Sequence, residues 1–247
     1  CGWGSEYLHD PRKGAVVVME TPSLGVRHVW KTDYTGRPDA VGFSRDDTRG
    51  VACWGGGRYS VWDCRSGRPL GVFTGPQKAG NLPALSTNAE LAAWSCSDGK
   101  IRVWDLLANR ERTAFQAGCF ISMAFSADAE RLATAWEVER MPSSDMFTPS
   151  RPQKMRVYDV NEGALKGTFR VDGRGVIWVA ISPDGNVVTT AAKGADLCLW
   201  DVATGRLRHT IKPHAQDVEH PTFSPDGKLF GVVTETVEEV AAPIVSN

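Results

Sequence analysis

The sequence predicts an all-β fold built from a repeated unit of four short antiparallel strands. Two observations support this prediction. Aromatic-aspartate pairs recur at a fixed interval, and a second marker, an apolar residue followed by serine, recurs in step with them. Such self-similarity is the sequence signature of a repeat architecture. Hydrophobic residues make up 42% of the 247, which suits an ordinary globular core.

The repeat has a period of 42 residues, interrupted once. The aromatic-aspartate pairs are Trp62-Asp63, Trp104-Asp105, Tyr158-Asp159 and Trp200-Asp201. The interval is 42 between the first two pairs and between the last two, but the middle interval is longer by 12. The second marker recurs as Phe43-Ser44, Leu85-Ser86, Phe125-Ser126, Ile181-Ser182 and Phe223-Ser224. The serine precedes the aromatic residue by 18 positions in three units and by 32 in the fourth, so 14 additional residues lie at one place.

Turn residues separate the strands of each unit. Ser182 and Ser224 are both followed by Pro-Asp-Gly between apolar runs, which predicts hairpin turns because proline fixes φ and glycine lets the chain reverse. Four residues beyond each marker aspartate stand Gly67, Asn109, Gly163 and Gly205. Asparagine is the usual substitute for glycine in a left-handed conformation, so we expect positive φ at all four positions.

Four strands can be placed in the fifth unit, and we name them a to d in chain order. Their predicted ranges are Val176–Ile181, Val187–Ala192, Leu197–Asp201 and Arg206–Ile211. Gly55-Gly-Gly57 precedes a strand and not a helix, so it is interpreted as a b–c turn and not as a phosphate-binding loop. Short, evenly spaced strands without helical periodicity predict a radial array, a β-propeller.

The segments YSVWD, IRVWD, MRVYD and LCLWD, in register with the serine markers, resemble the WD-repeat family over nearly the whole chain. The turns rich in Ser-Pro-Asp-Gly are similar to those of bacterial WD-repeat proteins. The resemblance implies a single propeller domain with six blades, at about 1–31, 39–74, 82–115, 120–170, 176–212 and 217–247. Ala15–Met19 fits strand c of a first blade without strand a, and Pro243–Asn247 fits strand c of a last blade without strand d. We therefore expect an arc or an imperfectly closed ring, a fragment of a longer, seven-bladed protein.

The resemblance also implies structural roles for particular residues. The four aromatic markers are expected to be large buried plates between blades, each followed by its aspartate. A family hydrogen-bonded set of His, Ser or Thr, Asp and Trp is represented only in fragments, by His214, Thr190 and Asp98 in three different blades.

Composition limits the partners. The formal net charge is -1 and both signs are dispersed, so we expect no nucleic-acid binding. No apolar run reaches the roughly 18 residues needed to cross a bilayer, so we expect no membrane partner. Six widely spaced cysteines without a CxxC pair predict buried thiols and a reducing, cytoplasmic location.

Neither catalytic nor metal chemistry is predicted. His209, His214 and His220 are spaced by five and six residues, and no Asp, Glu or Cys completes a tetrahedral set. No GxSxG elbow is present, so we assign no catalytic residue. We likewise expect no metal and no cofactor.

The predicted partner-binding residues lie near the narrow face and in an insertion. Trp178 and His220 share one register, four residues before their marker serines, where Trp178 is either an interaction anchor or filler between blades. The insertion, Glu137–Gln153, falls between strands b and c of the fourth unit and offers Met141, Met146 and Phe147. It is either a plain loop or a partner-contact loop.

These features favour a non-catalytic scaffold that binds other proteins and the remainder of its own chain. The alternative is an accessory propeller of a larger protein kinase or serine peptidase whose catalytic part lies outside this segment. Fold alone does not identify the partner.

Overall fold

The chain folds into consecutive antiparallel sheets. The computed structural model describes residues 13–19, 25–35, 38–44, 46–77, 79–80, 83–117, 122–135, 153–171, 176–192, 196–212 and 218–234. These residues form β-strands, turns and one 3-10 turn, η2 (Gly55–Gly57). No helix in this described part is long and apolar enough to span a membrane.

Six sheets follow one another in chain order, each made of strands that are adjacent in sequence. The first and last have two described strands each: β1 (Lys13–Met19) with β2 (Val26–Thr35), and β19 (Val218–Phe223) with β20 (Phe230–Thr234). The second sheet contains β3 (Ala40–Phe43), β4 (Arg49–Trp54), β5 (Arg58–Asp63) and β6 (Pro69–Thr74). The third contains β7 (Ala84–Leu85), β8 (Leu91–Ser95), β9 (Lys100–Asp105) and β10 (Arg110–Gln116). The fourth contains β11 (Ser122–Phe125), β12 (Arg131–Ala135), β13 (Gln153–Asp159) and β14 (Leu165–Val171). The fifth contains β15 (Val176–Ile181), β16 (Val187–Ala192), β17 (Leu197–Asp201) and β18 (Leu207–Ile211).

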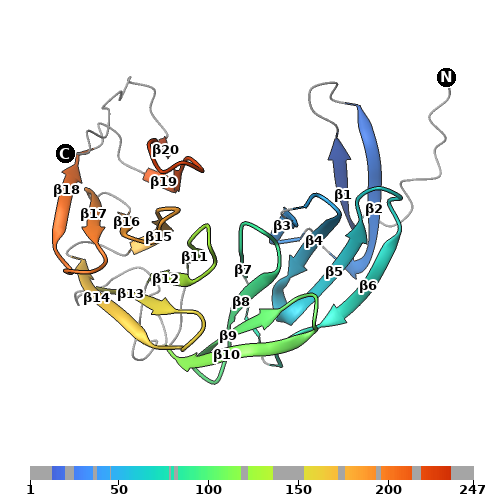
Figure 1. Ribbon diagram of the computed structural model, residues 1–247, viewed down its shortest axis with the longest axis horizontal. Helices are drawn as coiled ribbons and strands as arrows, with labels where there is room; N and C mark the ends of the chain where they lie inside the picture. Colours follow the sequence, from blue (N-terminus) through green and yellow to red (C-terminus); the bar gives the residue numbers. More distant parts are fainter. Residues whose placement is uncertain are drawn as a thin grey trace, which may run out of the picture.

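The sheets are arranged as the blades of a propeller and form an open arc (Figure 1). The inner strands β3, β7, β11 and β15 line the concave side, and each contacts its counterpart in the next blade. The outer strands β6, β10, β14 and β18 lie on the convex side. The predicted all-β propeller is therefore confirmed, as is its shape as an arc.

The strand limits agree closely with the sequence. In the fifth blade, strands a, b and c have the predicted bounds, and β18 begins at Leu207, one residue later than expected. Gly55–Gly57 connects β4 to β5, as predicted for a b–c turn. Gln153, expected at the end of the insertion, is already the first residue of β13. The rest of the insertion, the expected strand Pro243–Asn247 and His214 lie outside the described residues.

The marker serines stabilise the turns between strands a and b. In five blades the serine Oγ donates to the Asp or Asn side chain two residues later, at 2.5–2.7 Å, and accepts from the backbone N–H five residues later. In the fourth blade, Ser126 Oγ lies 2.5 Å from Asp128 Oδ1 and 3.0 Å from Arg131 N. One hydroxyl thus satisfies two polar groups at the start of each hairpin.

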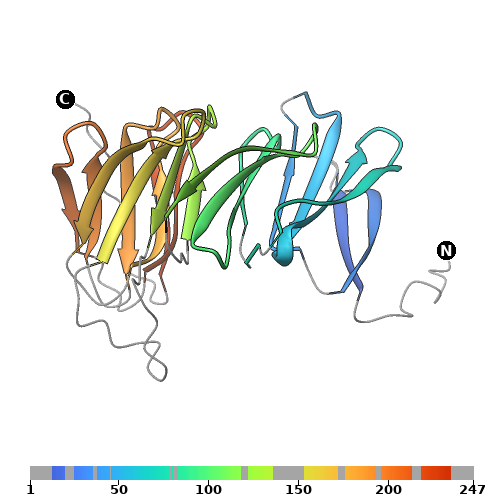
Figure 2. The same ribbon diagram turned by 90° about the horizontal axis from the view of Figure 1, so that it is seen from below.

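The marker aspartates stabilise the turns between strands c and d. Each accepts a hydrogen bond from the backbone N–H three residues later, and the four are Asp63, Asp105, Asp159 and Asp201. The position after that has the predicted positive φ, which is 48° at Asn109 and 66° to 71° at Gly67, Gly163 and Gly205. The a–b and c–d turns lie along one edge of the arc, opposite the turn Gly55–Gly57 (Figure 2).

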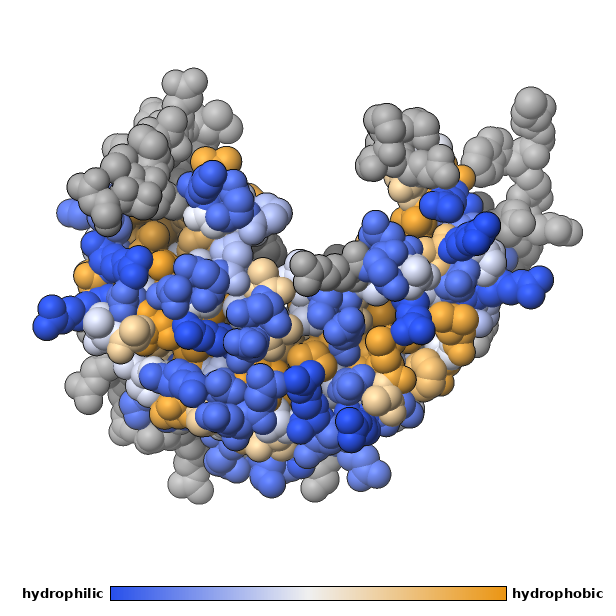
Figure 3. All heavy atoms as spheres, viewed as in Figure 1, coloured by the Kyte–Doolittle hydropathy of each residue, from blue (hydrophilic) through white to orange (hydrophobic). Residues whose placement is uncertain are grey.

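Aromatic rings link neighbouring blades. An outer-strand ring contacts the marker aromatic of the next blade in three cases: Trp30 with Trp62, Phe115 with Tyr158, and Phe169 with Trp200. The first two pairs are stacked, with ring centroids 5.0 and 4.3 Å apart. Hydrophobic residues accordingly lie between polar ones on the visible face of the arc (Figure 3).

The prediction that all four marker aromatics are buried plates is half wrong. Trp62 and Tyr158 are buried, but Trp104 and Trp200 are only partly covered. Phe169 meets Trp200 at a tilt of 59°, and so covers less of its face than a stacked ring would. Phe73, the outer-strand ring preceding Trp104, stacks instead on Tyr59 of its own sheet, at 5.1 Å.

Candidate protein-binding surfaces

The β1–β2 hairpin has two faces of different character. Its inner face packs on the second blade, where Val16, Val18 and Trp30 join a cluster containing Trp54 and Trp62. His28 Nε2 donates to the carbonyl oxygen of Cys64, at 3.1 Å. These contacts fix the hairpin to the arc and direct the other residues of both strands outward.

The outer face of the β1–β2 hairpin includes Val17, Met19, Val26 and Val29. Val17 pairs with Val29, and Met19 with Val26, so the four side chains are cross-strand neighbours. Each is between 49% and 54% exposed. Contiguous exposed apolar side chains are typical of protein interaction sites, because covering them removes apolar surface from water.

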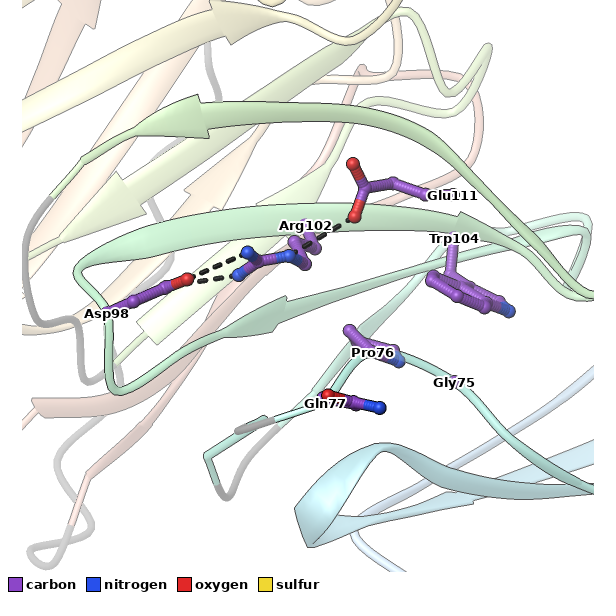
Figure 4. A pocket seen from close by; sticks show the side chains of 7 residues that line it. All are labelled: Gly75, Pro76, Gln77, Asp98, Arg102, Trp104 and Glu111. Carbon is purple, nitrogen blue, oxygen red and sulfur yellow. Dashed lines mark hydrogen bonds and ion pairs between the residues drawn. The ribbon is translucent and has the colours of Figure 1, made fainter.

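A second candidate surface is a cavity of about 450 Å³ between the second and third blades. Its lining residues come from the connection after β6, the β8–β9 turn and the outer strands β9 and β10: Gly75, Pro76, Gln77, Asp98, Arg102, Trp104 and Glu111 (Figure 4). Arg102 and Trp104 alternate along β9 and therefore share one face of the strand. Glu111 is the Cα partner of Trp104 on β10.

Arg102 is held by two carboxylates in this cavity. Its Nη1 and Nη2 atoms donate to Oδ1 and Oδ2 of Asp98, at 3.0 and 2.7 Å, and its Nε lies 3.2 Å from Glu111 Oε2. The hydrogen bonds from Arg102 lower the pKa of Asp98 to about 2, so Asp98 is ionised at neutral pH. Asp98, predicted as part of the family hydrogen-bonded set, thus pairs with an arginine of its own blade.

Trp104 forms one wall of the cavity and is anchored at its polar edge. Its Nε1 donates to Asn109 Oδ1, at 3.3 Å. The same oxygen accepts from the Tyr59 hydroxyl of the preceding blade, at 2.9 Å. The indole ring is therefore fixed by hydrogen bonds while part of its surface faces the cavity.

Of the predicted partner-binding side chains, the structure describes that of Trp178. Trp178, in β15, is partly buried and packs against Ala191, Leu197 and Leu199. His220 lies in β19, with a side chain outside the described part. Met141, Met146 and Phe147 also lie outside it. The role of these five residues in binding stays a prediction.

The structural residues of the family set are also only partly assembled. Trp200 Nε1 donates to Thr190 Oγ1, at 3.3 Å, which joins the predicted hydroxyl to the marker aromatic of the same blade. Among the residues the structure describes, no group of three or more His, Cys, Asp and Glu is placed to hold a metal ion. Cys53, Cys64 and Cys96 are buried and form no disulfide.

Sequence reasoning missed both candidate surfaces. The alternation of Arg102 and Trp104 in IRVWD was a visible sign that a cation and a ring share a face. The outer face of the β1–β2 hairpin could have been recognised from the apolar run of Ala15–Met19, which continues on both faces. Neither pattern identifies which face the adjacent blade covers.

Comparisons with known proteins agree with this architecture. Residues 67–105 match the WD40 family, described as WD domain, G-beta repeat. WD repeat-containing protein SL1-17 of Schistosoma mansoni is 24% identical over 152 residues, 61% of this chain and 46% of that protein. Eukaryotic translation initiation factor 3 subunit I of Pyricularia oryzae is 30% identical over 113 residues, 44% of this chain and 32% of that protein. The chain thus spans less than half the length of these relatives.

A similar fold occurs in a solved structure of hydrazine synthase from Kuenenia stuttgartiensis. The TM-score is 0.58 with 18% sequence identity, and the match covers 79% of this chain and 55% of that chain. At this identity the similarity concerns the fold alone. The in-register repeats and the WD40 match identify WD repeats in this chain, and the radial blades show that these repeats form a β-propeller.

Proposed function

We propose that this chain is a non-catalytic scaffold that binds other proteins. The observation that carries the proposal is the outer face of the β1–β2 hairpin, at one end of the arc, where four half-exposed apolar side chains adjoin one another and either another protein or a further part of the same chain would cover them. The inner face of the same hairpin is fixed to the second blade through Trp30 and Trp62, so a partner would meet a preformed surface. Preorganised surfaces bind with a smaller entropic cost.

The relatives support this proposal at a general level. Their printed names describe WD-repeat proteins and subunits, such as a subunit of translation initiation factor 3. WD40 domains mediate binding to other proteins, and members of the family are generally non-catalytic.

An accessory role in a larger enzyme is the second candidate. It is compatible with the similarity to much longer proteins, such as human apoptotic protease-activating factor 1, of which this chain covers 15%. The mass of the native polypeptide and the sequence adjoining this segment test it directly. A kinase-type glycine loop or a GxSxG elbow there would support the accessory role.

The scaffold proposal can be tested with two matched double variants. Val17→Glu with Val29→Lys places a pair of opposite charges on the outer face of the β1–β2 hairpin. Leu165→Glu with Leu207→Lys changes two similarly exposed residues on separate outer strands. Each variant and the unaltered chain would be purified from cells that produce the protein, with bound proteins identified by mass spectrometry.

We expect the first pair to lose specific partners and the second pair to keep them, with unchanged thermal unfolding in both. Retention of every partner by the first pair would reject this surface as the binding site. Absence of any specific partner with the unaltered chain would contradict the scaffold function itself.

A further inference from the structure

We infer that the cavity between the second and third blades binds a cationic side chain, a lysine or arginine, of a partner protein. This inference rests on the proposed scaffold function and names the chemistry of one contact. The cavity combines an aromatic wall with a local excess of negative charge.

The charge in the cavity favours a cation. Both terminal nitrogens of Arg102 donate to Asp98, and its Nε lies next to Glu111. The guanidinium group is therefore already paired with two carboxylates. Among the described lining residues, two carboxylates and one guanidinium leave one negative charge in excess, while Lys100, outside the lining on the same face of β9, acts electrostatically on Asp98. Glu111 is the most exposed of the three side chains, at 43%, so the excess charge is accessible from the cavity. Both terminal nitrogens of Arg102 are engaged with Asp98, which disfavours an anionic ligand at this guanidinium.

The ring of Trp104 also attracts a cation. Trp62 and Tyr158 are covered by Trp30 and Phe115 of the preceding blades, whereas Phe73 is stacked on Tyr59 and leaves Trp104 facing the cavity. A cation over the face of an indole is attracted by the negative potential of the ring. Trp104 and Glu111 are cross-strand partners, so one bound cation can reach both (Figure 4).

The cavity has room for a lysine or arginine side chain. Its volume of about 450 Å³ lies within the range of small-ligand pockets, roughly 300–1,000 Å³. Gly75 and Pro76 border it beside Trp104, and Gly75 lies close to the indole ring, since a Cβ atom added there would be in van der Waals contact with Cδ1 and Cδ2, at 3.7 Å. The methylene groups of lysine or arginine can pack on Pro76 and Trp104 while the charged end stays near Glu111.

Binding can be measured with small probes and the ¹⁵N-labelled chain. The probes are N-acetyl-arginine amide and N-acetyl-lysine amide, with N-acetyl-norleucine amide and N-acetyl-glutamate amide as neutral and anionic controls. The reporter is the indole N–H signal of Trp104 in the ¹H–¹⁵N spectrum, assigned by its loss in Trp104→Phe. We expect a saturable shift with the two cations, weakened by added salt, and none with the controls.

Two charge variants test the role of the carboxylate. Glu111→Gln keeps the shape of the side chain, and we expect about fivefold weaker binding, as for loss of one exposed ion pair. Glu162→Gln, on the fourth blade and outside the cavity, is the matched control and should leave binding unchanged. Equal binding by Glu111→Gln and the unaltered chain, equal shifts with norleucine, or no shift up to the solubility of the probes would each overturn the inference.

The outcome is separable from that of the scaffold proposal. If the cationic probes do not bind while partner proteins are still captured, the cavity inference fails and the scaffold function stands. If the probes bind but no partner is captured, the cationic specificity of the cavity is supported and its assignment to a partner protein fails.

Discussion

Tyr59 and Asn109 are joined by a hydrogen bond of 2.9 Å across the junction between the second and third blades. The Tyr59 hydroxyl is buried and also lies 3.1 Å from the carbonyl oxygen of Leu106. Asn109 therefore does more than substitute for glycine at a positive φ. Its side chain connects the c–d turn of one blade to a core residue of the previous blade.

This connection predicts a non-additive pair of substitutions. Asn109→Gly preserves the turn, since glycine accepts positive φ, and Tyr59→Phe preserves the ring. Each should reduce the free energy of unfolding by about 1 kcal/mol, because a buried hydrogen bond is lost. The double variant should lose clearly less than the sum, as urea unfolding of all four proteins will show. Strict additivity would mean that the bond contributes nothing.

The turn serines can be tested against a serine of equal burial. Ser126→Ala should cost about 1–2 kcal/mol of unfolding free energy, because Arg131 N and Asp128 lose their shared partner. Ser60 Oγ is also buried but has no hydrogen-bond partner among the described residues. Ser60→Ala should therefore be nearly neutral. Similar losses for the two variants would refute the role of the turn network.

Acid should weaken the a–b turns in a way that depends on one carboxylate. Hydrogen bonds from the Ser44 and Thr48 hydroxyls lower the pKa of Asp46 to about 2. Because this pKa lies below its value in the unfolded chain, the stabilisation is fully present above about pH 4 and is lost as pH falls through about 2.

The third blade supplies the matched comparison for this pH dependence, since Asn88 makes the same contact with Ser86 without titrating. Asp46→Asn should flatten the decrease in melting temperature between pH 5 and 2, and Asn88→Asp should steepen it. Melting curves recorded by circular dichroism over this range provide the measurement. Parallel curves for all three proteins would contradict the prediction.

Gly50 makes room for the ring that joins the first hairpin to the second blade. A Cβ atom there would lie 2.1 Å from Cη2 of Trp30. Gly50→Ala should thus displace Trp30 from Trp62 and cost about 1–3 kcal/mol, as overpacking does. Limited proteolysis should show faster cleavage within 13–35.

A strand glycine with space around it is the control. At Gly231 the nearest atom to an added Cβ is Thr222 Cγ2, at an ordinary 3.8 Å. Gly231→Ala should leave the cleavage rate of the first hairpin unchanged. Equal protection of the hairpin in the two variants would show that Trp30 tolerates the added methyl group.

The sequence determined the strands and turns but not the contacts between blades. Local patterns were sufficient to place Val176–Ile181 and the positive φ of Asn109, because both depend on residues within one repeat. The bond from Tyr59 to Asn109 joins residues 50 positions apart and depends on how the blades pack. The same is true of Trp104, whose exposure is decided by where the Phe73 ring lies.

The candidate surfaces also depend on how the blades pack together. Alternation places Arg102 and Trp104 on one face of β9, but only the fold shows that Gly75 and Pro76 complete a cavity with them. Conversely, the residues chosen from sequence, such as Trp178, were selected by register alone. Trp178 packs within the fifth blade, and its value as an anchor stays a prediction.

In the described part of the chain, the main contacts between sheets join each blade to the next one only. Residues 136–152 separate β12 from β13, yet these strands pair without a shift from Arg131 opposite Asp159 to Ala135 opposite Met155. Coupling of this kind is that of a one-dimensional array of repeats, in which the effect of a substitution on stability decreases with each blade that separates it from the site of change. Residues at one contact between blades, the length of a loop or a pocket residue can therefore change during evolution, while more distant blades keep their strand registers and their own binding surfaces.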